Sequence, residues 1–140
     1  MMKKDDCIFC KIANGIIPSP ALYEDDDFKV IFDKSPASKG HALILPKEHF
    51  DNAFSMDEEY AAKVFPVAVK VSRAMKEIFG FEGMNILQNN EEIAGQTVFH
   101  FHMHLIPRYT GDNVNIGWKT GEVSDSKAEE YAEAVRKIVK

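Results

Sequence analysis

Short hydrophobic runs in the first half of the chain have the length and the boundaries of strands. Apolar or β-branched stretches flanked by Asp, Gly and Pro predict strands over residues 21–24, 29–32 and 42–45. The same pattern returns at residues 84–89 and 97–106. We therefore expect these segments to form one sheet.

Hydrophobic residues at helical spacing occupy other parts of the chain. They predict a short helix over residues 7–13. The capping box Ser55-Met56-Asp57-Glu58 predicts the start of a main helix, kinked at Pro66. A second box, Ser126-Lys127-Ala128-Glu129, predicts a C-terminal helix. Its apolar face is formed by Tyr131, Ala132, Val135, Ile138 and Val139.

The order of these elements predicts an α+β fold, in which an antiparallel sheet carries one main helix and a C-terminal helix. A chain of 140 residues with 45% hydrophobic content can bury one core, so we expect one domain over residues 1–140. The first six residues are mostly polar, and no run has the length of a signal segment or a membrane span. A cytoplasmic protein without a membrane partner is therefore expected.

The strongest chemical signal is the alternation in residues 97–106. After Thr97 the odd positions are apolar, and positions 100, 102 and 104 are all histidine. A period of two predicts that the three imidazoles share one face of a strand. It also sends the intervening apolar side chains into the core, namely Phe99, Phe101, Met103 and Leu105. A surface stripe is the alternative, but this segment is otherwise strongly hydrophobic.

The three histidines cannot easily bind one metal ion together. In a straight strand His100 and His104 lie about 13 Å apart, whereas zinc–nitrogen bonds are about 2 Å long. The triad is therefore expected to divide its roles. The only cysteines, Cys7 and Cys10, are spaced as half a zinc site. His49 and His100 are the natural candidates to complete a Cys2His2 set.

The net charge of −5 narrows the class of ligand. Without a broad basic face the chain lacks the usual means of holding a nucleic-acid polymer by its phosphates. A small anionic ligand stays compatible with this charge if backbone N–H groups, histidines or a metal supply a local positive field.

These motifs together resemble the histidine-triad (HIT) family. The resemblance rests on His100-Phe101-His102-Met103-His104-Leu105-Ile106 and on Cys7-Ile8-Phe9-Cys10, Gly40-His41, Pro46-Lys47-Glu48-His49, Asn89 and Gly95-Gln96. It covers about residues 5–110. The sequence looks most like zinc-carrying bacterial members related to the histidine-triad nucleotide-binding proteins.

The resemblance implies a role for each of these residues. It implies a structural zinc on Cys7, Cys10, His49 and His100, and a nucleophile at His102. An imidazole suits that role because its neutral form attacks phosphorus without first losing a proton. His41 and His104 would support the nucleophile and the phosphate, and Asp33 would accept hydrogen bonds from the ribose hydroxyls. Further phosphate contacts would come from Asn89, Gly95, Gln96, Thr97 and His104.

The family also implies a purine nucleotide substrate and a homodimer. The base would lie on apolar side chains, for which we expect Ile8, Phe9, Leu22, Ile31 and Phe32. Trp118 would either cover the site of the other subunit or pack on the surface. The expected reaction moves a nucleoside monophosphate, AMP or GMP, from a phosphoramidate or phosphoanhydride to His102 and then to water. Open alternatives are a dinucleoside polyphosphate hydrolase, a catalytic-zinc hydrolase and a nucleotide-binding regulator with incidental turnover.

Overall fold

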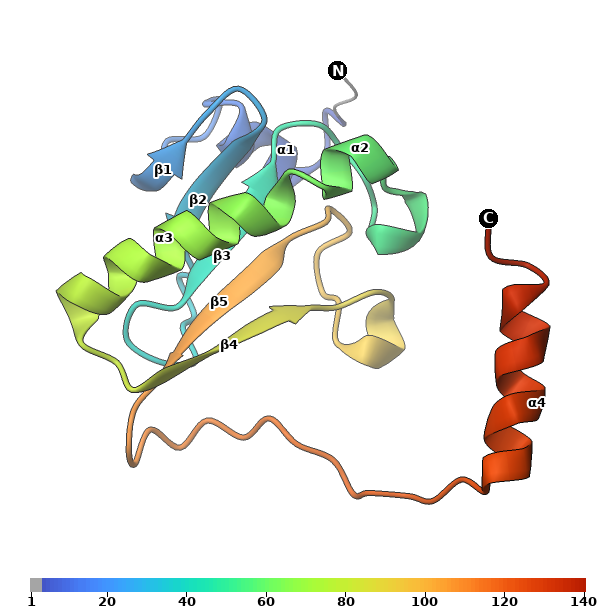
Figure 1. The fold of residues 1–140 in the computed structure, drawn as a ribbon. Coiled ribbons are helices and arrows are strands. Elements are labelled where there is room, and N and C mark those ends of the chain that lie inside the picture. The colour runs from blue at the N-terminus through green and yellow to red at the C-terminus, as the bar shows by residue number, and fades with distance from the viewer. Residues whose placement is uncertain (1–3) are drawn as a thin grey trace.

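The fold is a five-stranded antiparallel sheet with helices on both faces, seen in a computed structural model that describes residues 4–140 (Figure 1). The strand order is β1-β2-β3-β5-β4. The strands are β1 (Ala21–Glu24), β2 (Phe28–Phe32), β3 (Ala42–Pro46), β4 (Gly83–Gln88) and β5 (Met103–Arg108). The helices are α1 (Ile8–Ala13), α2 (Glu58–Ala61), α3 (Val64–Phe79) and α4 (Asp125–Arg136), with 3-10 turns at Ala53–Ser55 and Glu92–Ala94. The predicted α+β class is confirmed.

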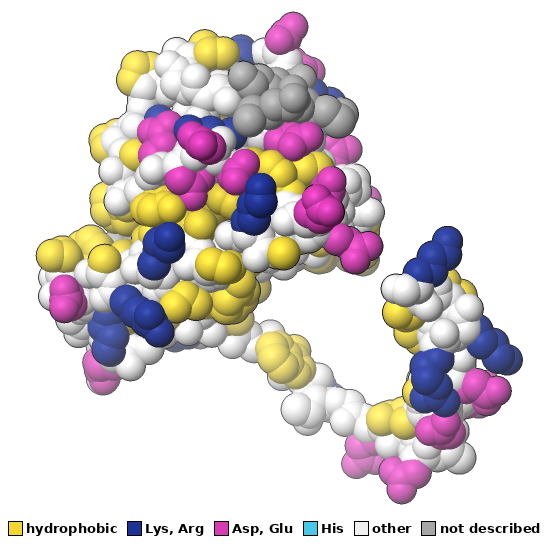
Figure 2. All heavy atoms as spheres, turned by 45° about the horizontal axis from the view of Figure 1, so that its top comes forward, with side chains coloured by type: hydrophobic (Ala, Val, Ile, Leu, Met, Phe, Trp, Pro, Cys, Tyr) yellow, Lys and Arg dark blue, Asp and Glu magenta, His cyan; other side chains and the backbone are white. Residues whose placement is uncertain are grey.

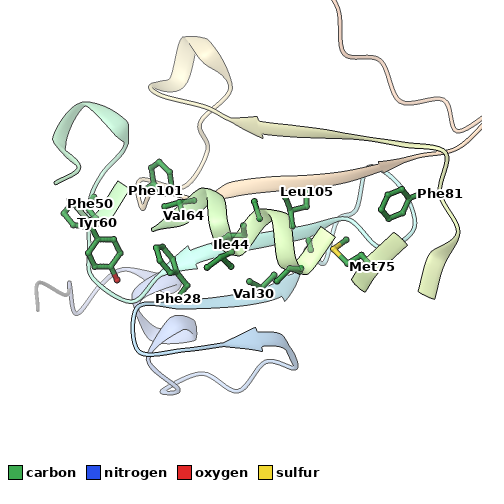
Figure 3. Packing of buried hydrophobic residues seen from close by; sticks show 14 residues of the cluster. Phe28, Val30, Ile44, Phe50, Tyr60, Val64, Met75, Phe81, Phe101 and Leu105 are labelled. Atoms are coloured by element: carbon green, nitrogen blue, oxygen red, sulfur yellow. The ribbon is translucent and has the colours of Figure 1, made fainter. Parts of the chain in front are cut away.

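Helix α3 crosses one face of the sheet and closes the larger core (Figure 3). Val30 of β2, Ile44 of β3 and Leu105 of β5 are fully buried beneath it. At the end of α3, Gly80 adopts a left-handed backbone with φ of 65°, a conformation that costs glycine little. The main helix therefore buries the middle of this face of the sheet.

Helix α1 covers part of the opposite face. A smaller cluster joins Ile12 and Ala13 to Ile31, Leu43 and Leu45. The amide of Asn14, which follows the helix, donates hydrogen bonds to the carbonyls of Cys10 and Lys47. Because Cys7 begins this helix and Cys10 lies within it, its packing places both thiols beside the sheet.

The main helix does not begin where the capping box predicted. Asp57, not Ser55, caps α2, with its carboxylate accepting the N–H of Glu59. The chain breaks at Ala62–Lys63, and α3 then starts at Val64. Pro66 explains the break, because it has no N–H to donate and its ring would collide with the carbonyl four residues earlier. Pro66 itself lies in the first turn of α3, where no intrahelical partner is needed, so the structure has two helices with a break between them where we predicted one helix with a kink.

The C-terminal helix also begins two residues earlier than predicted. Ser124 is its cap, and its hydroxyl accepts the N–H of Lys127. Asp125 then supplies a negative charge in the first turn, which the helix dipole favours. Ile138 and Val139 lie beyond the end of the helix at Arg136.

The histidine segment is only half a strand. Strand β5 begins at Met103, so His100 and His102 precede it in an irregular stretch. Phe101 and Leu105 are buried as predicted, but Phe99 is 44% exposed and not part of the core. The hydrogen bond from the Phe101 N–H to the carbonyl of Phe50, outside the sheet, replaces regular strand pairing there.

Among residues 4–140, no helix has both the length and the apolar character needed to cross a membrane. The expectation that residues 1–6 hold no signal segment concerns in part residues 1–3, which lie outside the described residues.

Candidate active site and metal centre

Two thiols and two imidazoles converge beside α1. The Sγ of Cys10 lies 3.2 Å from Nδ1 of His49 and 3.4 Å from Nδ1 of His100. The Sγ of Cys7 lies 3.4 Å from the same His100 nitrogen, and the two Nδ1 atoms are 3.2 Å apart. These separations are close to the edges of a tetrahedron around an ion with metal–ligand bonds of about 2.0–2.3 Å. The structure thus brings together all four residues predicted for the metal.

The hydrogen bonds of the two histidines fix which ring nitrogen carries the proton. Nε2 of His100 lies 2.8 Å from the carbonyl of Pro46, and Nε2 of His49 lies 2.8 Å from a carboxylate oxygen of Asp51. Both partners only accept, so each Nε2 donates and each neutral ring keeps a lone pair on Nδ1. Two lone pairs therefore face each other in a buried cluster with two sulfurs, an arrangement that a cation stabilises.

The local electrostatics agree with metal binding. Burial lowers the pKa of His100 to about 4, so this imidazole is neutral near pH 7 and available as a ligand. Burial also raises the pKa of the Cys10 thiol to about 11. A divalent cation would reverse that preference and hold the sulfur as a thiolate. Four protein donors with no open position form the closed type of site that is typical of structural zinc.

Asp51 was not predicted from the sequence. Its carboxylate orients His49, and the hydrogen bond from His49 lowers the pKa of Asp51. Metal-bound histidines commonly donate their second N–H to a carboxylate or carbonyl. An aspartate two residues after a candidate ligand histidine was therefore a signal that could have been used.

His102 is oriented by the backbone of the metal-cluster residue His100. Its Nδ1 lies 2.8 Å from the His100 carbonyl, which only accepts, so the proton is on Nδ1 and Nε2 holds the lone pair. The ring of Phe9 packs edge-on against the His102 ring, with 5.1 Å between the two ring centroids. Burial lowers the pKa of His102, so the imidazole is neutral near pH 7.

Hydrogen bonds also determine which ring nitrogen carries the proton in His41 and in His104. The N–H of Ala37 donates to Nδ1 of His41 at 2.9 Å, so the proton of the neutral His41 ring is on Nε2. That Nε2 lies 2.9 Å from Nδ1 of His104, which must accept. His104 therefore carries its proton on Nε2. Burial lowers the pKa of His104 to about 4 and lowers the pKa of His41, so both rings are neutral near pH 7.

A second group of potential metal ligands, Asp33, His41 and His104, does not fit a metal as well. The Asp33 carboxylate lies 3.7 Å from Nε2 of His41. To bind an ion through Nε2, a neutral His41 would need its proton on Nδ1, where it would face the N–H of Ala37. The group of Asp33, His41 and His104 therefore suits a metal ion less well than the cluster of two cysteines and two histidines, although each group contains two histidines.

A pocket of about 380 Å³ opens on the sheet face opposite α3. His102, His104, Asp33 and Thr97 line it together with apolar side chains. Of the five residues expected to contact a base, four line this pocket, namely Ile8, Phe9, Ile31 and Phe32. The expectation that Leu22 contacts the base was wrong, because Leu22 lies on the other side of the sheet in a groove against α3.

The loop from Asn89 to Thr97 approaches the pocket only at its end. Gln96 is 1% exposed, and its amide donates to the carbonyls of Asp51 and Val98 while accepting from the N–H of Glu91. The oxygen and the nitrogen of its side-chain amide are thus both engaged in hydrogen bonds that hold the loop. These bonds argue against the direct phosphate contact that we expected for Gln96. Gly95 has φ of 100°, a backbone conformation that residues with a side chain rarely adopt, and a Cβ there would lie 3.2 Å from the side-chain nitrogen of Asn89.

Residues 14–111 match the HIT domain. The protein hit of Bacillus subtilis is 43% identical over 97% of this chain and 94% of its own. The adenosine 5'-monophosphoramidase hnt1 of Schizosaccharomyces pombe is 37% identical over 96% and 98%. The adenylylsulfatase HINT3 of Arabidopsis thaliana is 39% identical, over 78% of this chain and 55% of its own length.

Solved structures agree. A HIT family protein from Bacillus anthracis superposes with a TM-score of 0.93 at 40% identity, over 99% of this chain and 100% of its own. A protein from Streptococcus mutans gives 0.92 at 44% identity, over 96% and 86%. A Zn-bound histidine triad family protein from Mycobacterium smegmatis gives 0.73 at 31% identity, over 95% of each chain. The chain therefore belongs to the histidine-triad family.

Proposed function

We propose that this chain is a nucleotide hydrolase that transfers a nucleoside monophosphate from a phosphoramidate or phosphoanhydride to His102 and then to water. One observation carries the proposal. The hydrogen bond to the His100 carbonyl leaves the lone pair of a neutral His102 on Nε2, in a pocket that also holds His104 and Asp33. A nucleophile in this state attacks without prior deprotonation. Relatives named as a monophosphoramidase and an adenylylsulfatase support the same class of reaction.

In the first step Nε2 of His102 would form a bond to the α-phosphorus, and the P–N or P–O bond would break as the leaving group takes the electron pair together with a proton from solvent. The ring then becomes positively charged, and the His100 carbonyl stabilises its Nδ1–H. In the second step water attacks phosphorus and releases a proton to solvent, the N–P bond breaks with its electron pair on Nε2, and a neutral His102 returns. His104 would hold a phosphoryl oxygen through its Nε2–H throughout.

His41 is proposed as a positioning residue. Its Nε2–H donates to Nδ1 of His104, and this bond keeps the other proton of His104 on the nitrogen that would face the phosphate. Thr97, at the end of the loop, lines the pocket and would add a second donor. Asn89 and Gly95 contact each other within the loop, and we propose them as further phosphate contacts. Thr97 lies nearer to the phosphate in this proposal, because it lines the pocket.

The donor set of Cys7, Cys10, His49 and His100 fits zinc, and we propose that zinc holds α1 against the histidine segment. Bound there, the ion supplies cross-linking and charge neutralisation, not an activated water. Because His100 offers Nδ1 to the metal cluster and its carbonyl to His102, the same residue connects the two sites. We further propose a homodimer that works in the cytoplasm.

A substrate panel tests the function. We expect purified protein to release AMP from adenosine 5'-monophosphoramidate, and the assay should include adenylyl sulfate and a dinucleoside polyphosphate. Chromatography of the released AMP gives the turnover for each. Binding of AMP without turnover of any member would instead support a regulator, and exclusive cleavage of the dinucleoside polyphosphate would support the alternative hydrolase.

Asp33→Ala is expected to weaken AMP binding about 10–100-fold, because a charged hydrogen bond to a ligand is worth about 1.5–3 kcal/mol. One oxygen of Asp33 accepts the N–H of Ser35, which holds the carboxylate at the pocket wall. The affinity for 2',3'-dideoxy-AMP should change little, since it lacks the ribose hydroxyls. Calorimetric titration of both ligands decides this, with exposed Asp26→Ala as the control. An equal loss for the two ligands would contradict the role of Asp33.

A further inference from the structure

The turn that precedes the histidine segment contains a residue in a strained backbone conformation. Glu91 has φ of 78° and ψ of 157°, a region that residues with a side chain rarely occupy. Such strain persists only where surrounding contacts hold it, and it is common at functional sites. The turn comprises residues 89–97, the yellow segment that follows β4 in Figure 1, and it ends at Thr97, which lines the pocket. The contacts that hold Glu91 therefore also determine how the turn meets a ligand.

Gln96 pairs with both main-chain groups of Glu91. The side-chain oxygen of Gln96 accepts the Glu91 N–H at 2.8 Å, and the main-chain N–H of Gln96 donates to the Glu91 carbonyl at 3.1 Å. The side-chain nitrogen of Gln96 donates to two further carbonyls. A buried amide whose groups are all paired holds its surroundings in one arrangement. Gln96 thus closes the turn and keeps Glu91 in its strained conformation.

Asn52 reaches the same two residues from another part of the chain. Its side-chain nitrogen lies 3.1 Å from a carboxylate oxygen of Glu91 and 3.2 Å from the side-chain oxygen of Gln96. Its side-chain oxygen accepts the N–H of Phe54, a group that only donates, so the nitrogen is the atom that faces the turn. Asn52 is 5% exposed, and burying an amide is costly unless it is hydrogen-bonded. Both hydrogens of this amide therefore serve the turn.

The segment of residues 49–53, in which this asparagine lies, connects the turn with the metal cluster. The carboxylate of Asp51 accepts from Nε2 of His49, and the carbonyl of Asp51 accepts a hydrogen bond from the turn. The N–H of Ala53 donates to the side-chain oxygen of Asn90 at 2.7 Å. The turn is thus held from one side by a segment that is itself fixed at the metal cluster.

The pocket has little net charge with which to hold a phosphate. The chain carries a net charge of −5, and on the face seen in Figure 2 lysine and arginine side chains are scattered among acidic ones. One lysine and one aspartate line the pocket, Lys34 and Asp33, and its two histidines are neutral near pH 7. Neutral donors stabilise an anion well when their positions are fixed before it binds. The shape of the turn should therefore matter for phosphate binding.

We propose that Asn52 is a positioning residue for the phosphate, because it holds the turn through Gln96 and Glu91 so that Thr97 faces the phosphate of a bound nucleotide. This inference rests on the proposed function, since it assumes a nucleotide phosphate beside Thr97. Among the described residues, those that line the pocket include Thr97 but not Asn52. Asn52 therefore acts on the ligand only through the turn, and its loss should weaken contacts to the phosphate but not to the base or the ribose.

Two variants of Asn52 separate this role from a general loss of stability. Asn52→Ala removes the amide and also the cap of the 3-10 turn Ala53–Ser55, whereas Asn52→Ser keeps a capping oxygen but cannot donate to both partners. Both variants should weaken AMP binding about tenfold, while the affinity for adenosine, which lacks the phosphate, stays unchanged. Calorimetric titration of both ligands measures this. Val71→Ala, in the core beneath α3, is the control for lost stability, and it should change neither affinity.

A double-variant cycle shows whether Asn52 acts through Gln96. Asn52→Ser combined with Gln96→Ala should lose no more AMP affinity than Gln96→Ala alone, because the two residues belong to one network. If Asn52→Ala does not fold, Asn52→Ser alone decides. The inference is overturned if the Asn52 variants weaken AMP and adenosine equally, if they leave AMP binding unchanged, or if the two losses in the cycle add. An unmodified chain that binds AMP no more tightly than adenosine would instead contradict the proposed function itself, and with it the phosphate beside Thr97.

Discussion

Replacing His102 with alanine is expected to reduce AMP release from adenosine 5'-monophosphoramidate by several powers of ten, while AMP binding changes only a few fold. The loss is large because neighbouring groups cannot take over the covalent route once the nucleophile is gone. His104 is already fixed as a donor by its bond from His41, so it has no free lone pair to substitute. His104→Ala should therefore be milder, since it removes one hydrogen bond to the phosphate and leaves the attacking nitrogen in place.

The covalent step can be observed directly. Acid-free quenching of a slow phosphoramidate substrate, followed by intact-mass analysis and peptide mapping, should place a nucleotidyl group on His102 in the unmodified chain. The smaller variant His102→Gly should regain part of its turnover when imidazole is added, because the free ring can occupy the space and attack phosphorus. An adduct mapped to another residue would contradict the assignment, and undiminished turnover of His102→Ala would exclude a histidine nucleophile altogether.

Part of the candidate site could be predicted from the sequence, because the spacing of the two cysteines and of the three histidines is local. Cys7 and Cys10 lie one helical turn apart, and alternation around His102 separates polar from apolar side chains. Of the three histidines, only His104 lies in a regular strand, but the structure still brings the predicted metal residues close together, with Cys10 Sγ within 3.4 Å of Nδ1 of both His49 and His100. Strand positions also followed from composition, since β-branched runs bounded by turn residues have few other stable solutions.

Long-range contacts explain what the sequence did not predict. The start of β5 depends on Phe101 bonding to Phe50, which ends regular pairing before Met103 and leaves Phe99 exposed. Gln96 looked like a ligand residue, but partners distant in sequence, such as Asp51, consume its hydrogen-bonding groups. Leu22 has the right chemistry for a base pocket and lies on the wrong sheet face. Periodicity gives the two faces of a strand but does not say which of them meets the ligand.

Removing the metal is expected to destabilise the fold strongly and to impair turnover indirectly. Purified without chelators, the protein should contain one zinc per chain by elemental analysis, and Cys7→Ala with Cys10→Ala should contain none. Because the binding free energy of a structural metal contributes to folding, chelation should lower the unfolding temperature by many degrees. Lost order at His100 would also disturb the carbonyl that orients His102.

Asp51→Asn supplies the graded control for the metal prediction. It keeps all four ligands but weakens the acceptor that orients His49, so zinc affinity should fall about 10–100-fold and full occupancy should return with excess zinc. Cadmium then separates the two roles of a metal. It binds thiolates well, so cadmium-loaded protein should regain the stability and the turnover of the zinc form if the site is structural. Restored stability with turnover still lost would instead mean that the metal activates water, and zinc retained by the double cysteine variant would place the ion elsewhere.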